Sequence, residues 1–345
     1  MTRRELLWAS VLLALKRAKF EQAIDLIEEQ AQTGYVSAAT LSVRDGTFSA
    51  SRSFGGAANA GSVFLIASLT KPMTASAVMI LVDRKDVALS DRVQRFIPEF
   101  RGDGREGVLV RHLLNHTSGL PDMLPNDHEL RSQHAPLSDF VAHTCRTPLL
   151  FTPGTQWRYQ SMGILLAGEI VRRVSKQPLY TFLRVQVYEP LRMKSTSLGL
   201  GGRPISETMQ CQVDQVSDWD WNSSYWRNLA APWGGALSTG RDLMKFLDYF
   251  AHPHEGILKA DTALAMIRDE THGLSHRWGF GWMLNNGTFG QGCSAGAFGH
   301  EGSTGCLCWC DPKKDLSFVL LTTKPAEHSE RRVLWPVSNS VSIEM

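Results

Sequence analysis

The sequence predicts an α+β protein in which an antiparallel sheet, built from both ends of the chain and flanked by helices, carries a mainly helical lobe. Runs rich in β-forming residues occur near both ends. Between them, residues 86–230 contain helical patches interrupted by prolines and few alternating runs. We therefore expect a sheet domain formed by residues 20–85 and 231–345, with residues 86–230 as the helical lobe.

The first 19 residues allow two interpretations. Arg3 and Arg4 precede an apolar run from Leu6 to Leu15, which is too short to span a bilayer as a helix. This arrangement resembles a twin-arginine export signal, so we favour export to the periplasm over a cytoplasmic location. The alternative is an amphipathic opening helix, because no small-x-small cleavage site is present and the run ends in basic residues: Lys16, Arg17 and Lys19.

The sheet domain is predicted to begin with a helix and a hairpin. Apolar residues recur at helical spacing between Phe20 and Gln32, and Gly34 is well placed to end that helix. Two β-rich runs then flank Asp45-Gly46, a dipeptide that supplies the positive φ angles of a tight hairpin turn. The next segment, FLIASLTKPMTASAVMILVDR, changes from a strand-like to a helix-like pattern.

The C-terminal part is predicted to contain one helix and then three strands. The segment GGALSTGRDLMKFLDYF predicts a helix with Ser238 or Thr239 as its N-cap. The segments RWGFGWML, AFGHEGSTGCLCWCDP and LSFVLLTTK predict successive strands, with turns at Asn286-Gly287 and around Asp311-Pro312. These strands would complete the sheet that the N-terminal hairpin begins.

Charge and cysteine spacing exclude several function classes. The formal net charge is only +2, and no basic stripe interleaved with aromatic residues is present, so we expect no nucleic-acid partner. Cys306, Cys308 and Cys310 alternate in CLCWC, which on a strand places them on one face. A zinc site would need a fourth ligand at a familiar spacing. We therefore predict a buried strand, with no metal and no cofactor.

Ser68 and Lys71 form the first candidate catalytic pair. At this spacing on a helix the lysine amine can come near the serine hydroxyl. The amine can accept the serine proton only if burial or a nearby positive group lowers its pKa. Free backbone N–H groups at the helix N-terminus could also face a developing oxyanion. However, Ser-x-x-Lys occurs by chance in many chains, and Ser68 alone could be an N-cap.

Two further segments carry a resemblance to a known family. FTPGTQWRYQSMGILLAGEIV places Tyr159 and Ser161 before a helix, and FGHEGSTG places His300, Glu301 and Gly302 at the start of a strand. Together with the serine–lysine pair, they resemble the Ser-x-x-Lys, Tyr-x-Asn and Lys-Thr-Gly (or His-x-Gly) motifs of the penicillin-recognising serine hydrolases. The chain is most similar to the branch containing class C β-lactamases, D-alanyl-D-alanine carboxypeptidases and family VIII carboxylesterases.

This likeness follows the order of that branch across roughly residues 20–324. It implies an α/β sandwich of the β-lactamase/transpeptidase type, with the active site in the cleft between the sheet domain and the helical lobe.

The resemblance also implies roles for individual residues. Ser68 corresponds to the acylated nucleophile, while Lys71 and Tyr159 share the proton taken from it. Tyr159 can do so only if the ammonium of Lys71 lowers its pKa from about 10. The oxyanion hole would consist of the backbone N–H groups of Ser68 and Ser303. Gly302 would let the substrate backbone lie close to the strand.

Two departures from the family pattern bear on the substrate. Ser161 stands where β-lactamases and peptidases usually carry asparagine, so it cannot offer the same amide to a substrate. His300 stands where they carry lysine, and Glu301 follows it, which weakens the fixed positive charge that grips a substrate carboxylate. We expect Ser161, His300, Glu301 and Gly302 to contact the substrate, and both departures favour neutral esters.

A competing nucleophile lies in GCSAG, residues 292–296, which matches the Gly-x-Ser-x-Gly elbow. Asp311 or Asp315 and then His328 follow Ser294 in the order of a triad. An elbow needs a strand before it and a helix after it, whereas Ser294 is predicted to lie between two strands. We therefore prefer Ser68 as the nucleophile.

Other residues attract attention for their type. His112 and His116, in RHLLNHTSG, are predicted to be structural because nothing pairs them with a nucleophile. The segment SDWDWNSSYWRNLAAPWGG is dense in aromatic residues, which could form core or line the cleft and bind an apolar group. We include Trp233 among the substrate-binding candidates on this basis.

The expected function is therefore that of a serine hydrolase, most simply a carboxylesterase acting on small to medium esters through an acyl-enzyme. A D-alanyl-D-alanine carboxypeptidase or a weak β-lactamase is the first alternative. A non-catalytic sensor or binding protein is the second, although a pure binder has no need of Ser68, Lys71 and Tyr159 together. The expected partner is a small ester or amide, and no membrane span is predicted.

Overall fold

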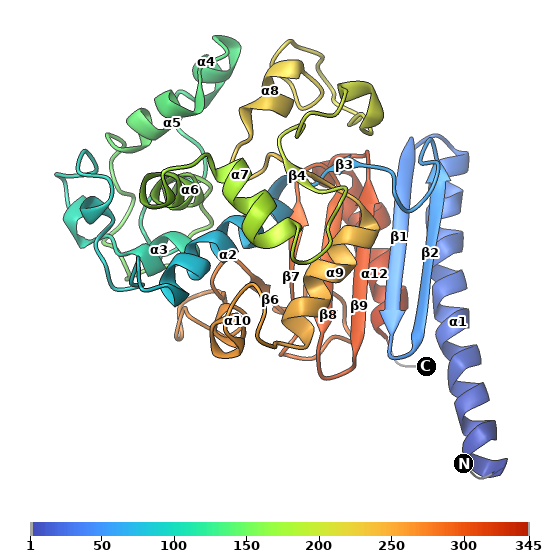
Figure 1. Cartoon of the computed structure of the whole chain (residues 1–345). Coiled ribbons are helices and arrows are strands. Elements are labelled where there is room, and N and C mark those ends of the chain that lie inside the picture. Colours follow the sequence, from blue (N-terminus) through green and yellow to red (C-terminus); the bar gives the residue numbers. More distant parts are fainter. Residues whose placement is uncertain (1–2, 344–345) are drawn as a thin grey trace.

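The computed structural model describes residues 3–343, with side chains from residue 13 onward, and confirms the predicted α+β class (Figure 1). Its main sheet has six strands, all paired antiparallel, in the order β2-β1-β9-β8-β7-β6. In chain order they are β1 (Ala38–Asp45), β2 (Phe48–Gly55), β6 (Met283–Leu284), β7 (Phe298–Gly302), β8 (Cys306–Asp311) and β9 (Leu316–Thr322). The two ends of the chain thus meet in one sheet, where β1 pairs with β9.

Helices cover both faces of this sheet. On one face lie α1 (Arg3–Gln32), α11 (Ala326–Ser329) and α12 (Trp335–Ser342); α9 (Gly240–Ala251) packs on the other. In β8, Leu307 and Trp309 join the core beneath α1 and α12, whereas the three alternating cysteines join the core on the α9 side. The predicted one-sided placement of the cysteines on a buried strand is therefore confirmed.

The opening helix and hairpin match the sequence pattern closely. Helix α1 ends at Gln32, and Gly34 follows with a φ of +73°. The β1–β2 turn contains Gly46 at a φ of +59°, and the Lys16 Nζ atom lies 2.6 Å from the Asp45 carboxylate. Since α1 already begins at Arg3, residues 3–19 continue the opening helix; the export interpretation remains a prediction. None of the helices within residues 3–343 has the length and hydropathy needed to cross a bilayer.

Residues 86–230 are mainly helical. The helices there are α3 (Val110–Leu114), α4 (Asp127–Ser132), α5 (Leu137–Thr144), α6 (Met162–Ser175), α7 (Leu179–Leu183) and α8 (Ser224–Leu229). Helix α2 (Thr70–Asp83) packs against α6 and links this region to the sheet. A small second sheet joins β3 (Phe64–Leu65), β5 (Ala236–Ser238) and β4 (Ser197–Leu198), and α10 (Ala260–Met266) lies before β6.

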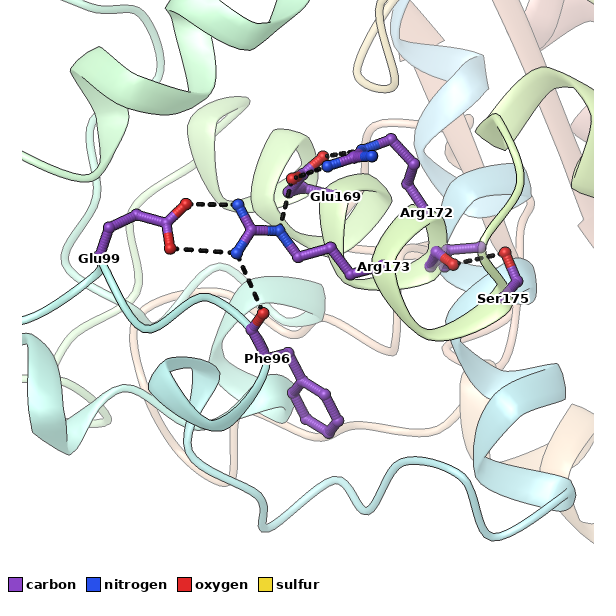
Figure 2. A network of polar contacts seen from close by, with 7 residues as sticks. Phe96, Glu99, Glu169, Arg172, Arg173 and Ser175 are labelled. Atoms are coloured by element: carbon purple, nitrogen blue, oxygen red, sulfur yellow. Dashed lines mark hydrogen bonds and ion pairs between the residues drawn. The ribbon is translucent and has the colours of Figure 1, made fainter.

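An ion-pair network connects α6 to the segment around Glu99 (Figure 2). The guanidinium of Arg173 pairs with Glu99, donates to the Phe96 carbonyl oxygen at 3.2 Å and donates to Glu169 at 2.6 Å. Arg172 makes two hydrogen bonds to Glu169, each 2.7 Å long. Bidentate arginine–carboxylate pairs restrict geometry strongly, so the network fixes α6 against the segment around Glu99.

Two predicted elements differ from the structure. The segment GGALSTGRDLMKFLDYF is not one helix, because Ala236–Ser238 forms strand β5. Helix α9 then begins with Thr239 as its N-cap, and Thr239 was one of the two residues predicted for that position. The strand predicted for RWGFGWML is restricted to β6. Before β6, at Gly279 and Gly281, the backbone packs closely against residues of α10 and α2 and does not continue as an extended strand. A Cβ at Gly279 would lie 2.0 Å from the Met266 carbonyl oxygen, and one at Gly281 would lie 2.5 Å from the Ala75 Cβ.

Candidate active site

Ser68 lies in a short 3-10 turn, Ala67–Leu69, between β3 and α2. Ala67 has a φ of +45°, a conformation that non-glycine residues rarely adopt and that often marks a functional segment. Strand β7 passes close to this turn: a Cβ at Gly302 would lie 2.5 Å from the Ile66 carbonyl oxygen. Glycine at position 302 is therefore required for the strand to approach the Ser68 turn.

The Lys71 amine is buried directly beside Ser68. Its Nζ atom donates to Ser68 Oγ at 2.8 Å and to the Trp233 carbonyl oxygen at 3.0 Å, and lies 4.8 Å from the centre of the Tyr159 ring. Burial lowers the pKa of Lys71 to about 7, although the negative charge of Asp122 acts in the opposite direction. Near neutral pH a large fraction of this amine is uncharged, the form that can accept a proton from a hydroxyl.

Tyr159 does not have the lowered pKa that it would need to accept the Ser68 proton. Burial raises the pKa of its phenol above the ordinary value; the Ser68 hydroxyl opposes this change, and the charges of Asp122 and Glu301 add to it. The neighbouring amine cannot lower the phenol pKa by a full positive charge, because burial also lowers the pKa of Lys71. Tyr159 is therefore a neutral phenol that can donate a proton, and Lys71 is the better base.

Aromatic rings surround Tyr159 in a way that sequence reasoning missed. The ring of His116 lies 4.8 Å from that of Tyr159 and 4.7 Å from that of Trp278, between centroids. Trp157 stacks in turn on His276 at 4.1 Å. Desolvation holds the pKa of His116 well below its ordinary value, so it packs as a neutral ring. Its segment resembled the family, but nothing local indicated that it would reach Tyr159.

His300 and Glu301 lie on opposite faces of β7, as neighbours on a strand must. His300 is buried against Tyr159 and Trp278, and burial lowers its pKa to about 3, so it carries no charge at neutral pH. Glu301 instead accepts a hydrogen bond from the Trp335 indole at 3.4 Å, and burial raises its pKa to about 7. The Glu301 side chain therefore lies on the face of β7 opposite His300, and its contact with a substrate remains a prediction.

The indole of Trp233 is buried among other aromatic rings. It is 4% exposed and packs against Phe140 and Trp226, with ring centroids 6.0 and 6.3 Å away. A substrate contact through the indole remains a prediction. Trp233 acts on the site through its backbone carbonyl oxygen, which binds the Lys71 amine. At Trp226 and Trp233, therefore, the aromatic segment forms core.

Ser161 has a partner that the sequence did not indicate. Its hydroxyl donates to Asp122 Oδ1 at 2.6 Å, and its backbone N–H donates to the Asp122 carbonyl oxygen at 3.2 Å. Asp122 is exposed, whereas Ser161 is buried. The position that usually offers an asparagine amide thus presents a serine hydroxyl already bound to a carboxylate.

The two predicted oxyanion donors are unpaired within residues 3–343. Neither the Ser68 nor the Ser303 backbone N–H donates a hydrogen bond to another backbone or side-chain group in that range. Ser303 is exposed, directly after β7, and its carbonyl oxygen is held by the Ala326 N–H at 2.9 Å. Ser303 directly follows Gly302, which packs against the Ser68 turn, and free N–H groups of this kind are the donors that an oxyanion hole needs.

The competing triad is not assembled. Ser294 Oγ donates to Asp311 Oδ1 at 2.7 Å, but His328 is bound elsewhere, with its Nε2 atom 2.9 Å from Asp214 Oδ2. Strand β7, not a helix, follows Ser294. The structure therefore provides neither the base nor the backbone turn that a nucleophile elbow needs.

The fold and this site together define a protein of the class in which a Ser-x-x-Lys pair at a helix start faces a tyrosine and the edge of a sheet. The chain belongs to the Beta-lactamase family, whose model matches residues 22–341.

Relatives and solved structures agree with that assignment. The sequence is 36% identical to esterase EstB of Burkholderia gladioli over 147 residues. This alignment covers 38% of this chain and 37% of EstB. It is 27% identical over 292 residues to penicillin-binding protein 4* of Bacillus subtilis (strain 168), covering 78% of this chain and 63% of that protein. The chain thus spans less than two thirds of either relative. The structure of EstCE1, a hydrolase with promiscuous acyltransferase activity, matches 95% of this chain and 99% of its own, with a TM-score of 0.81 and 19% identity.

Proposed function

We propose that the protein is a carboxylesterase that works through an acyl-enzyme on Ser68. The observation that carries this proposal is the 2.8 Å contact between the Lys71 amine and the Ser68 hydroxyl, within a buried site that lowers the pKa of the amine to about 7. A nucleophile and its base must be within hydrogen-bond reach, and the base must be unprotonated near the working pH.

In the proposed reaction, the neutral Lys71 amine takes the proton of Ser68 as Oγ attacks the ester carbonyl carbon. The negative charge that develops on the carbonyl oxygen is stabilised by the N–H groups of Ser68 and Ser303. The ester C–O bond then breaks, and the departing alkoxide receives a proton from Lys71, directly or through the Tyr159 hydroxyl. In the second half, water attacks the acyl carbon and gives a proton to the same groups. The bond between the acyl carbon and Ser68 Oγ then breaks, Oγ takes that proton back, and the acid is released.

Three features support an ester substrate over a penicillin or a peptide. His300 is uncharged at neutral pH, so it offers no fixed cation to a substrate carboxylate. The hydroxyl of Ser161 is already bound to Asp122, so it is poorly placed to recognise an acyl amide. A relative, EstB of Burkholderia gladioli, is named an esterase.

A comparison of an ester with a penicillin tests this choice. We expect multiple turnovers of p-nitrophenyl butyrate, and little lasting adduct when the protein is incubated with benzylpenicillin and weighed intact by mass spectrometry. Persistent penicilloyl-protein without ester turnover would contradict the proposal and favour a penicillin-binding peptidase, the kind of protein that the second relative is named for.

The pH dependence should follow the ionisation of Lys71. Because burial lowers its pKa to about 7, the free amine predominates above that pH and disappears below it. We expect kcat/KM to rise with pH, to reach half of its plateau near the pKa, and to fall about tenfold for each pH unit below it. Initial rates with a neutral ester between pH 5 and 9 measure this, and a flat profile would contradict Lys71 as the base.

A further inference from the structure

Asp122 places an unpaired negative charge beside the candidate active site. Its Oδ1 atom is bound by the Ser161 hydroxyl, but Oδ2 has no hydrogen-bond partner within residues 3–343, and no lysine, arginine or histidine there lies within 4.0 Å of the carboxylate. Ser161 is two residues after Tyr159 and is the N-cap residue of α6. The free oxygen therefore belongs to an exposed residue anchored to the same short segment as Tyr159.

The field of this carboxylate reaches the reacting groups. Asp122 is the charged residue that acts on the pKa of Lys71, and Asp122 and Glu301 both act on the pKa of Tyr159. The histidines packed around Tyr159, His116 and His300, are neutral because burial lowers their pKa values. Neither histidine therefore provides a positive charge that would balance Asp122. Once Lys71 is uncharged as well, the Asp122 carboxylate makes the electrostatic potential around Lys71 and Tyr159 negative.

We propose that Asp122 is a specificity-determining residue that favours substrates carrying a cationic group, such as an ammonium, in the acyl part, and disfavours anionic ones. This inference rests on the proposed esterase function and narrows its substrate class. Ser161 holds one carboxylate oxygen, which leaves the other to accept a hydrogen bond or a positive charge. An asparagine at position 161 would instead offer a neutral amide.

A matched series of esters tests the role of charge with shape held nearly constant. The p-nitrophenyl esters of 4-(trimethylammonio)butanoic acid, 5,5-dimethylhexanoic acid and 4-sulfobutanoic acid present a cation, a neutral isostere of that cation and an anion. The measured quantity is the ratio of kcat/KM for each charged ester to that for the neutral one. Wild type is compared with Asp122→Asn and with the control Asp86→Asn, another exposed aspartate, which lies beyond the far end of α2.

We expect the wild-type protein to prefer the cationic over the neutral ester, and the neutral over the anionic one. Asp122→Asn should lower the cationic-to-neutral ratio and raise the anionic-to-neutral ratio, each by about tenfold, because a charge close to the substrate is removed. Asp86→Asn should leave both ratios as they are. Raising the salt concentration should reduce the wild-type preference by screening. This salt series tests the proposal even if Asp122→Asn does not fold.

The failures of the two proposals are distinguishable. If wild type turns over the neutral ester but shows no charge preference at low salt, or if Asp122→Asn keeps both ratios, the role of Asp122 is contradicted and the esterase proposal stands. If wild type turns over none of the three esters, the esterase proposal itself fails, and the substrate class inferred from Asp122 fails with it.

Discussion

Replacing Ser68 by alanine is expected to reduce kcat/KM for p-nitrophenyl butyrate by about 10⁴-fold or more. The substitution removes the oxygen that would form the acyl-enzyme, and within residues 3–343 the other candidate serine nucleophile lacks a base. Ser68 is partly exposed in a short turn, so the loss of one oxygen should leave the fold intact. Initial rates measured on purified wild type and variant, with circular dichroism to check folding, give the result.

Ser294→Ala is the matched control for that experiment. Ser294 is bonded to Asp311 and has no histidine beside it, so its loss should change kcat/KM by less than about threefold, as expected of a partly buried polar contact outside the site. The opposite pattern, with activity lost in Ser294→Ala and retained in Ser68→Ala, would contradict the assignment of Ser68 and restore the competing triad.

The second large effect is expected for Lys71→Met, which should lower kcat/KM by about 10³-fold through loss of the general base. Methionine is similar in length and apolar, so it can occupy the buried path of the lysine side chain. Lys194→Met, at an exposed lysine, provides the control, with activity expected to stay at the wild-type level. Retention of activity by Lys71→Met would contradict the proposed role of the amine.

The same substitution makes a prediction about stability. The pKa of Lys71 is about 7 in the folded protein and about 10.4 in an unfolded chain, so the unfolded state binds more protons between these two values. The contribution of Lys71 to the free energy of unfolding therefore rises with pH across that window. At lower pH, burial of the charged amine destabilises the folded state. We expect the melting temperature of Lys71→Met at pH 7 to equal or exceed that of wild type. A clear decrease would show that the amine contributes to stability.

Local patterns predicted most of the elements, because hairpins, caps and strand alternation depend on neighbours in the sequence. The turn at Gly46, the N-cap at Thr239 and the buried cysteine face of β8 are examples. The strand predicted for RWGFGWML is present only at β6, because the two glycines before β6 permit close backbone approaches to α2 and to the end of α10. Such approaches depend on distant residues and leave no local signal.

The site shows the same limit. The spacing of Ser68 and Lys71 and the family resemblance were sufficient to nominate the pair, and the structure brings the two atoms together. Sequence spacing could not give the direction of the Tyr159 pKa shift, because that shift depends on how completely the folded chain buries the phenol. The bond between Asp122 and Ser161 joins positions 39 residues apart, and only the folded chain shows that a carboxylate stands beside this site.

The central claim is that Ser68 becomes acylated, and intact-protein mass spectrometry during ester turnover tests it most directly. The protein would be mixed with p-nitrophenyl butyrate, quenched with acid within the first turnovers and digested to locate any added mass. We expect a butyryl group on Ser68 that forms and disappears during turnover and is absent from Ser68→Ala. Turnover of the ester with the acyl group on another residue, or with an equal rate in Ser68→Ala, would contradict it.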